Sequence, residues 1–379
     1  MTPVVRDLSS LVAFPTVSNR PISALAEFVA QRFEDMGFTI ERFSDPIQEG
    51  KYNVVASIGP KDTPGLVLSG HMDVVPTEGQ PWSRDPFQIH QENGRLYGRG
   101  TADMKGFIAA TMQAAKNLSP NNYVRELICI WTYDEEIGCF GSHHLATQFE
   151  ELGRRLPQAC LIGEPTGFEM LRMHPGHSAL DVQIVGKAAH SSRPDLGSNA
   201  IETAGKIIGA LQEFSEILAG EHHMAEYLER PWVTLNTATI SGGCAVNIVP
   251  DHCNLQVGFR PLPGHDVHVL TARITEYVRQ RVSDSKTPFE IRLARSTPAL
   301  LSPDGTPLQN TLCNHAVKPD AGAATFATDG GNLARLGCAP IIFGPGSIEV
   351  AHMADEYIPV DELMRAEGII ESVIRAHCC

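Results

Sequence analysis

Short apolar segments alternate with amphipathic stretches along the first part of the chain. Four nearly all-apolar segments predict strands: NVVASIG, LVLSGHMDVVP, RELICIWTYDEE and ACLIGEPT. Helical spacing of apolar residues predicts helices over SALAEFVAQRFEDMGF and GFIAATMQAAKNL, and Gly/Pro-rich loops separate the elements. Strands that are apolar on both faces and alternate with helices are typical of a mostly parallel sheet flanked by helices. The pattern therefore predicts an α/β fold.

The pattern changes after about residue 175. The chain continues with a strand LDVQIVGKAAH, a helix from Asn199 to Gly220, strands VTLNTATISG and CNLQVGFR, a helix from Val267 to Val282, and a strand FEIRLAR. This β-α-β-β-α-β order is a recognised compact module. The tail returns to the first pattern with a glycine-rich loop ATDGGN, a strand APIIFGPG and a helix VDELMRAEGIIESVIRAH. We therefore expect one domain made of residues 1–175 and 296–379, and a second domain, residues 176–295, inserted into it.

Composition excludes several classes of partner. With 30 Lys+Arg against 44 Asp+Glu the net charge is −14, so nucleic acid and anionic membranes are poor partners. No apolar run is long enough to span a membrane, and MTPVVRDLSS lacks the pattern of a secretion signal. The 9 cysteines are scattered without a C-x-x-C motif, which indicates small buried side chains in a reducing compartment. We expect a soluble cytoplasmic protein.

Acidic and imidazole side chains collect where the predicted strands end. His71 and Asp73 lie two apart in an extended segment and so share a face. Asp103 lies in the loop GRGTADMKG, and Glu164 ends the strand in LIGEPT. Taken singly, His71 and Asp73 are more often paired by a hydrogen bond at a strand end. Asp103 alone is more often a helix cap, and Glu164 a solvated carboxylate. Their common position at strand ends is what makes them candidates for a site.

The carboxyl ends of parallel strands lie along one edge of the sheet, where α/β folds build their sites. Five candidate groups fall at this edge, and without cations they would repel one another: His71, Asp103, Glu135, Glu136 and Glu164. Nitrogen and oxygen ligands favour zinc, with cobalt or manganese as substitutes. Two ions sharing a bridging carboxylate need a second imidazole, and AHMADEY supplies one at His352.

The adjacent acids Glu135 and Glu136 are expected to have different roles. Consecutive residues in extended backbone point in opposite directions, so only one of the pair can ligate a given ion. The other faces the cleft, where a carboxylate beside an activated water is a general base. The sequence thus indicates a metal-dependent hydrolase.

Five motifs in this order, GHMDVVP, GRGTADMKG, DEEIG, GEPT and AHMADEY, resemble those of the co-catalytic zinc amidohydrolases. This family includes carboxypeptidase G, aminoacylase, succinyl-diaminopimelate desuccinylase and acetylornithine deacetylase. The resemblance covers essentially the whole chain and shows no departure at a ligand position. It implies a di-zinc catalytic domain with an inserted lid.

The resemblance also implies a role for each site residue. Two zinc ions per subunit share Asp103 as the bridging ligand. One zinc is also bound by Glu136 and His352, and the other by His71 and Glu164. In the same pattern the general base is Glu135, and the residue that orients the first histidine is Asp73.

In the resembled family the inserted domain is both a lid and a dimerisation domain. The resemblance implies a homodimer in which His190, in KAAHSS, stabilises the oxyanion in the partner subunit's active site. It implies that Asn247 and Arg260 hold the carboxylate of the substrate. Taken alone, a lid histidine or asparagine is more often structural, and Arg260 would be a surface charge. The remaining histidines considered are interpreted as structural: His143, His144, His174 and His177.

The implied substrate is a small N-acyl amino acid. The segments GGCAVNIVPDHC and LGCAPIIFGPGSIEVAHMADEYIPV look closer to the deacetylase members of the family, which favours hydrolysis of N-acetyl-L-ornithine to L-ornithine and acetate, a step of arginine biosynthesis. The alternatives are a succinyl-diaminopimelate desuccinylase or a dipeptide metallo-carboxypeptidase. A non-catalytic metal-binding relative is a more remote alternative, since fold alone does not give function. The intact Glu135 argues against it.

Overall fold

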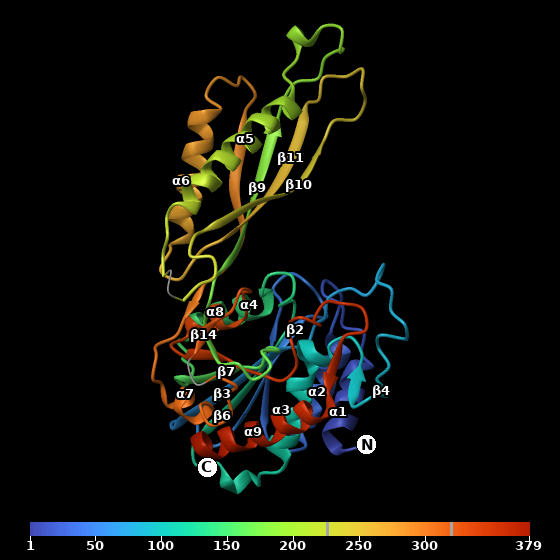
Figure 1. Cartoon of the computed structure of the whole chain (residues 1–379), viewed down its shortest axis with the longest axis vertical. Coiled ribbons are helices and arrows are strands. Elements are labelled where there is room, and N and C mark those ends of the chain that lie inside the picture. The colour runs from blue at the N-terminus through green and yellow to red at the C-terminus, as the bar shows by residue number, and fades with distance from the viewer. Residues whose placement is uncertain (225–226, 319–320) are drawn as a thin grey trace. The chain divides into compact units, whose positions relative to one another are not determined.

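The computed structural model describes residues 1–224, 227–318 and 321–379 (Figure 1). The chain forms two compact units. Unit 1 comprises Met1–Met173, Leu300–Ala324 and Thr328–Cys379, and unit 2 comprises His174–Ala299 with Thr325–Ala327.

Unit 1 is built on a 9-stranded sheet with the order β1-β2-β6-β3-β7-β15-β8-β13, in which β14 also pairs with β8. Its strands are β1 (Thr39–Ser44), β2 (Tyr52–Ile58), β3 (Pro64–His71), β6 (Glu126–Thr132), β7 (Ala159–Ile162), β8 (Leu171–His174), β13 (Leu300–Leu301), β14 (Gly322–Ala323) and β15 (Ala339–Ile342). The central strands β6, β3, β7 and β15 are parallel to one another. Strand β2 pairs antiparallel with both β1 and β6, and β8 pairs antiparallel with β15 but parallel with β14. The predicted mostly parallel α/β sheet is confirmed.

Helices flank this sheet, with α3 and α9 on one side and α4 and α8 on the other (Figure 1). Trp131 of β6 is fully buried and packs against Phe107 of α3 and against Phe33, which lies in the helix Ser23–Glu34. The helices of unit 1 are α1 (Pro3–Val12), α2 (Ser23–Glu34), α3 (Gly106–Lys116), α4 (Phe140–Glu151), α7 (Pro307–Leu312), α8 (Gly330–Ala334) and α9 (Val360–Cys378), with short helical turns at Thr101–Lys105 and Pro120–Asn122. Helix α8 begins inside the segment that the sequence predicted as a glycine-rich loop.

A second, 3-stranded sheet of unit 1 has the order β16-β5-β4, formed by Tyr357–Pro359, Arg95–Tyr97 and His90–Glu92. In this sheet Ile358 pairs with Leu96, and both side chains are fully buried. The pairing brings the segment before residue 357 beside the segment after residue 97. These two segments carry His352 and Asp103.

Unit 2 has the predicted order β-α-β-β-α-β: β9 (His177–Val185), α5 (Ala200–Ala219), β10 (Thr234–Gly242), β11 (His252–Arg260), α6 (Val267–Arg281) and β12 (Phe289–Thr297), with a helical turn at Pro194–Leu196. Its antiparallel sheet has the order β10-β11-β9-β12. Helix α5 begins after Asn199 as predicted, because that side chain accepts hydrogen bonds from the N–H groups of Ile201 and Glu202.

Strand β9 ends at Val185, although the sequence predicted extended structure as far as His190. A Cβ atom at Gly186 would lie 2.1 Å from the main-chain oxygen of Ser198, so the chain crosses there at a distance that only glycine permits. From this point Lys187 pairs with Ser198, and His190 pairs with Ile248, as isolated bridges.

In the part of the chain that the structure describes, no helix is both long enough and apolar enough to cross a membrane. All nine cysteines are free thiols, and three of them, Cys244, Cys313 and Cys379, are exposed.

Candidate active site

The candidate side chains of unit 1 come mainly from the carboxyl ends of adjacent parallel strands, as the sequence predicted. His71 is the last residue of β3, Glu135 and Glu136 follow β6, and Glu164 follows β7. The loop before α3 supplies Asp103. His352 lies in the segment between β15 and β16 and has a left-handed backbone with φ 63°.

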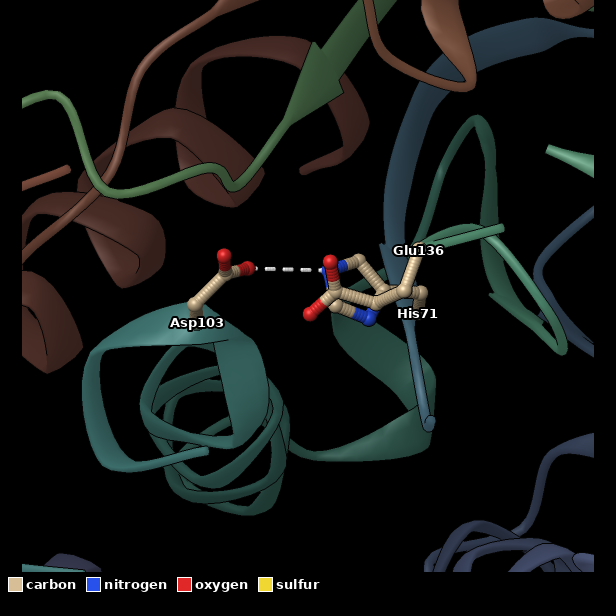
Figure 2. A group of neighbouring side chains, drawn as sticks. All are labelled: His71, Asp103 and Glu136. Carbon is tan, nitrogen blue, oxygen red and sulfur yellow. Dashed lines mark hydrogen bonds and ion pairs between the residues drawn. The ribbon is translucent and has the colours of Figure 1, made fainter. Parts of the chain in front are cut away.

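The first cluster consists of His71, Asp103 and Glu136, and in it Asp103 points toward His71 (Figure 2). Its Oδ1 is 2.9 Å from His71 Nε2, and its Oδ2 is 3.2 Å from His352 Nε2. His352 Nε2 is also 2.8 Å from Glu136 Oε2. The two carboxylate oxygens of Asp103 therefore face different histidines, which is the arrangement needed for a ligand that bridges two ions.

A second cluster lies beside the first and shares His71 with it. Ligand atoms of His71, Glu135 and Glu164 lie within 4.8 Å of one another, as do those of His71, Asp103 and Glu136. Glu164 is 4% exposed. The structure thus brings together the five residues that the sequence predicted as metal ligands, and places Glu135 next to them.

Burial and mutual repulsion perturb the acids of the two clusters. Burial raises the pKa of Glu135, to which the charge of Glu164 adds, and burial and the charge of Asp103 raise the pKa of Glu136 to about 7. Burial and the charge of Asp103 likewise raise the pKa of Glu164. Hydrogen bonds to Asp103 and Glu136 raise the pKa of His352 to about 10. In the absence of a cation, the glutamates and His352 therefore keep their protons to a higher pH than the same side chains in water.

The residues fit a metal centre. Within residues 1–224, 227–318 and 321–379, no Lys or Arg forms an ion pair with Glu135, Glu136 or Glu164, and Glu136 Oε1 is buried without a hydrogen-bond partner. A buried carboxylate oxygen without a donor is costly unless a proton or a cation approaches it. Imidazole and carboxylate donors suit zinc, cobalt or manganese.

The first acid of the DEE motif has a different partner. Asp134 forms a buried ion pair with Lys51, and its Oδ1 accepts the N–H of Asn19 at 3.1 Å. Strand β6 ends at Thr132 and Asp134 has φ 50°, so the predicted strand through Glu136 is wrong at its end. The chain turns at Asp134, and this turn sets the directions of the two glutamates that follow.

Asp73 is fully buried and contacts both the histidine and the two glutamates. His71 Nδ1 lies 2.9 Å from the main-chain oxygen of Asp73 and 3.7 Å from its carboxylate. A carbonyl oxygen can only accept, so Nδ1 carries the proton and Nε2 faces the clusters. The Asp73 carboxylate accepts the N–H groups of Glu135 at 3.1 Å and Glu136 at 3.4 Å.

Sequence reasoning missed two residues that adjoin Glu135. The Cys139 thiol donates to Glu135 Oε1 at 3.3 Å, and Asp329 accepts a hydrogen bond from Thr132 Oγ1 at 2.5 Å. Ligand atoms of Glu135, Cys139 and Asp329 lie within 4.8 Å of one another. The spacing of four residues between Glu135 and Cys139 could have indicated the thiol. Asp329 follows no strand in sequence and gave no signal.

The three predicted lid residues belong to unit 2. His190 is exposed, and its Nδ1 accepts the N–H of Ser192 at 3.2 Å, which leaves the ring proton on Nε2. The N–H of Ser191 donates to the main-chain oxygen of Asn247 at 3.0 Å, so the His190 and Asn247 segments are adjacent. Arg260 ends β11 opposite Thr234 and is half-buried.

The fold and the convergent acids define a hydrolase of the metallopeptidase type, and the chain belongs to peptidase family M20/M25/M40, whose model matches residues 67–376. It is 33% identical to an acetylornithine deacetylase of Vibrio atlanticus, over 93% of this chain and 91% of that protein. It is 32% identical to an acetylornithine deacetylase of Myxococcus xanthus, over 98% of this chain and 96% of that protein.

Solved structures share the fold at lower identity. An M20 family metallo-carboxypeptidase from Sulfolobus solfataricus is 18% identical, with a TM-score of 0.80 and coverage of 99% of both chains. A tripeptidase from Staphylococcus aureus is 19% identical, with a TM-score of 0.76, covering 98% of this chain and 97% of that one. A Bacillus subtilis protein described as a dinuclear metal-binding peptidase of the M20 family is 14% identical, with a TM-score of 0.69, covering 98% of this chain and 97% of that one.

Proposed function

We propose that the protein hydrolyses the amide of N-acetyl-L-ornithine to L-ornithine and acetate, a step of arginine biosynthesis, with two zinc ions per subunit. The observation that carries this proposal is that the two carboxylate oxygens of Asp103 face different histidines, His71 and His352, within a buried group of acids. The near full-length similarity to acetylornithine deacetylases supports the choice of reaction.

The contacts of the residues support a role for each of them. Bound divalent ions supply Lewis acidity, which makes water more acidic and polarises the amide carbonyl. Glu135 is the general base. Because the Cys139 thiol donates to Glu135 Oε1, the atom that accepts the proton of the attacking water is Oε2, which then delivers it to the amide nitrogen as the leaving amine forms.

Unit 2 is proposed to act as a lid and to join two subunits in a homodimer. His190 Nε2 carries the proton in the tautomer set by Ser192, so the ring is prepared to donate to an oxyanion of the partner subunit's site. Asn247 and Arg260 are proposed to hold the α-carboxylate of the substrate, which every candidate substrate contains.

Two cations beside Asp103 bear on the choice of acyl group. A succinyl group would bring a second carboxylate that needs a dedicated cation. Arg99 is 1% exposed and pairs with Glu356, and Lys105 is fully buried, with its Nζ donating to the main-chain oxygen of Phe14. Arg99 is therefore already paired, and burial lowers the pKa of Lys105 to about 7, so neither side chain supplies a full free charge, which favours the small neutral acetyl group.

The test is a substrate panel on the zinc-loaded protein: N-acetyl-L-ornithine, N-acetyl-L-citrulline, N-succinyl-diaminopimelate and dipeptides. We expect kcat/KM for N-acetyl-L-ornithine to exceed that for N-succinyl-diaminopimelate by at least about 10²-fold, because an unpaired carboxylate in a pocket without a cation costs several kcal/mol. The Glu135→Gln protein, prepared in parallel, reports any contaminating activity. Equal or reversed specificity constants would favour the desuccinylase or the dipeptidase alternative.

A further inference from the structure

Gln80 connects the segments that carry Asp103 and His352. Its side-chain Nε2 donates to the main-chain oxygen of His352 at 2.7 Å. Its Oε1 accepts from Arg99 Nη2 at 2.5 Å and from Trp82 Nε1 at 3.0 Å. Because two donors meet Oε1, only one orientation of the amide satisfies all three contacts. Gln80 is thus fixed with its amino group toward the carbonyl of His352.

The same network reaches the Asp103 loop through a buried ion pair. Arg99 Nη1 donates to Glu356 Oε2 at 2.7 Å and to the main-chain oxygen of Met353 at 3.3 Å. The Glu356 carboxylate also accepts three main-chain N–H groups, those of Gly100 at 3.1 Å, Ala102 at 2.9 Å and Asp103 at 3.1 Å. Two segments 253 residues apart in sequence are therefore bound to the same pair of side chains.

His352 needs such support from its backbone. Its side chain is 51% exposed, so packing restricts the ring only in part. Its φ of 63° lies in the left-handed region, which is uncommon for residues other than glycine. The contacts of Nε2 with Asp103 and Glu136 therefore depend on where the main chain of residue 352 is held.

We propose that Gln80 is a positioning residue for His352, and that this contact maintains the affinity of the metal position formed by Asp103, Glu136 and His352. The inference rests on the proposed metal centre. The other position, at His71 and Glu164, has no contact with Gln80 among the described residues, so the effect falls on one ion of the two. Loss of an interaction that orients a metal ligand typically costs about 10–100-fold in metal affinity.

The variant Gln80→Glu removes only the hydrogen bond from Gln80 to the main-chain oxygen of His352. The new carboxylate can still accept from Arg99 and Trp82, but it cannot donate to the carbonyl of His352. The matched control is Ser83→Ala, which removes the bond from Ser83 Oγ to Asp355 Oδ1, 3.0 Å long, between the same two segments without touching His352. Zinc affinities are measured by competition with a chromophoric chelator. We expect one of the two zinc ions to bind about 10–100-fold less tightly in Gln80→Glu, with the affinity of the other ion, and both affinities of the control, within about 2-fold of wild type.

A double-mutant cycle with His352→Ala shows whether the effect passes through His352. In the His352→Ala background, Gln80→Glu should change zinc affinity by less than about 2-fold, and thermal melts should show a similar Tm with and without Gln80→Glu. Equal weakening of both ions, an undiminished effect in the His352→Ala background, or no effect at all would refute the positioning role. A wild-type protein that binds fewer than two ions would refute the proposed metal centre and the positioning role together.

Discussion

The ion pair between Lys51 and Asp134 gives a direct test of how the segment that carries Glu135 and Glu136 is held. The two side chains are 2% and 0% exposed, and Asp134 immediately precedes Glu135. In Lys51→Met the side-chain volume is nearly kept, but Asp134 is left as a buried charge without its partner. Removal of one partner of a buried pair costs about 3–5 kcal/mol. An exposed pair, such as Arg20 and Glu78 at 59% and 65% exposure, contributes about 0–1 kcal/mol.

The assay is calorimetric unfolding of the zinc-loaded protein, in which the transition of unit 1 is followed. About 2–4 °C of Tm corresponds to 1 kcal/mol for a unit of this size, so Lys51→Met should lower its Tm by roughly 6 °C or more. The control Arg20→Met should shift it by no more than about 2–4 °C. Adding Asp134→Asn to Lys51→Met should recover most of the loss, because no buried charge then remains. Equal shifts for Lys51→Met and Arg20→Met, or no recovery in the double variant, would refute this reasoning.

Three further predictions concern the acids and histidines of the two units. Glu135→Gln should keep both metal ions and lower kcat by at least about 10²–10⁴-fold, whereas Glu136→Gln should lose metal; the reverse outcome, read by metal analysis, would exchange their roles. If His190 acts across subunits, mixing inactive Glu135→Gln and His190→Ala proteins should restore part of the activity, and no recovery after confirmed subunit exchange would contradict this. Burial lowers the pKa of His174 from 6.5 to about 4, so its contribution to stability is present above pH 6.5 and is lost as the pH falls toward 4. In denaturant titrations, the free energy of unfolding of His174→Gln should fall by about 3 kcal/mol less than that of wild type between pH 6.5 and pH 4. An unchanged dependence of the unfolding free energy on pH would contradict this.

Patterns that depend on local sequence predicted the fold well. Apolar runs marked the central strands, and Asn199 marked the start of α5, because a strand core and a helix cap are each set by neighbouring residues. The end of β9 was missed, because Gly186 is constrained by a main-chain oxygen that only the folded chain brings close. Lys51 and Glu356 were missed for the same reason: each contacts its partner across 83 or more residues of sequence.

The buried acids of unit 1 fall into two groups that the sequence does not separate. Asp134 pairs with Lys51 and Glu356 pairs with Arg99, and these acids hold main-chain N–H groups in the loops around the site. The acids of the two ligand clusters have histidines and one another as neighbours, and burial raises the pKa values of the glutamates among them. A basic side chain placed in the ligand clusters would neutralise the charge that a divalent ion needs. The chain thus uses its own cations to fix the loops and leaves the acids between them without a basic partner, as the proposed metal centre requires.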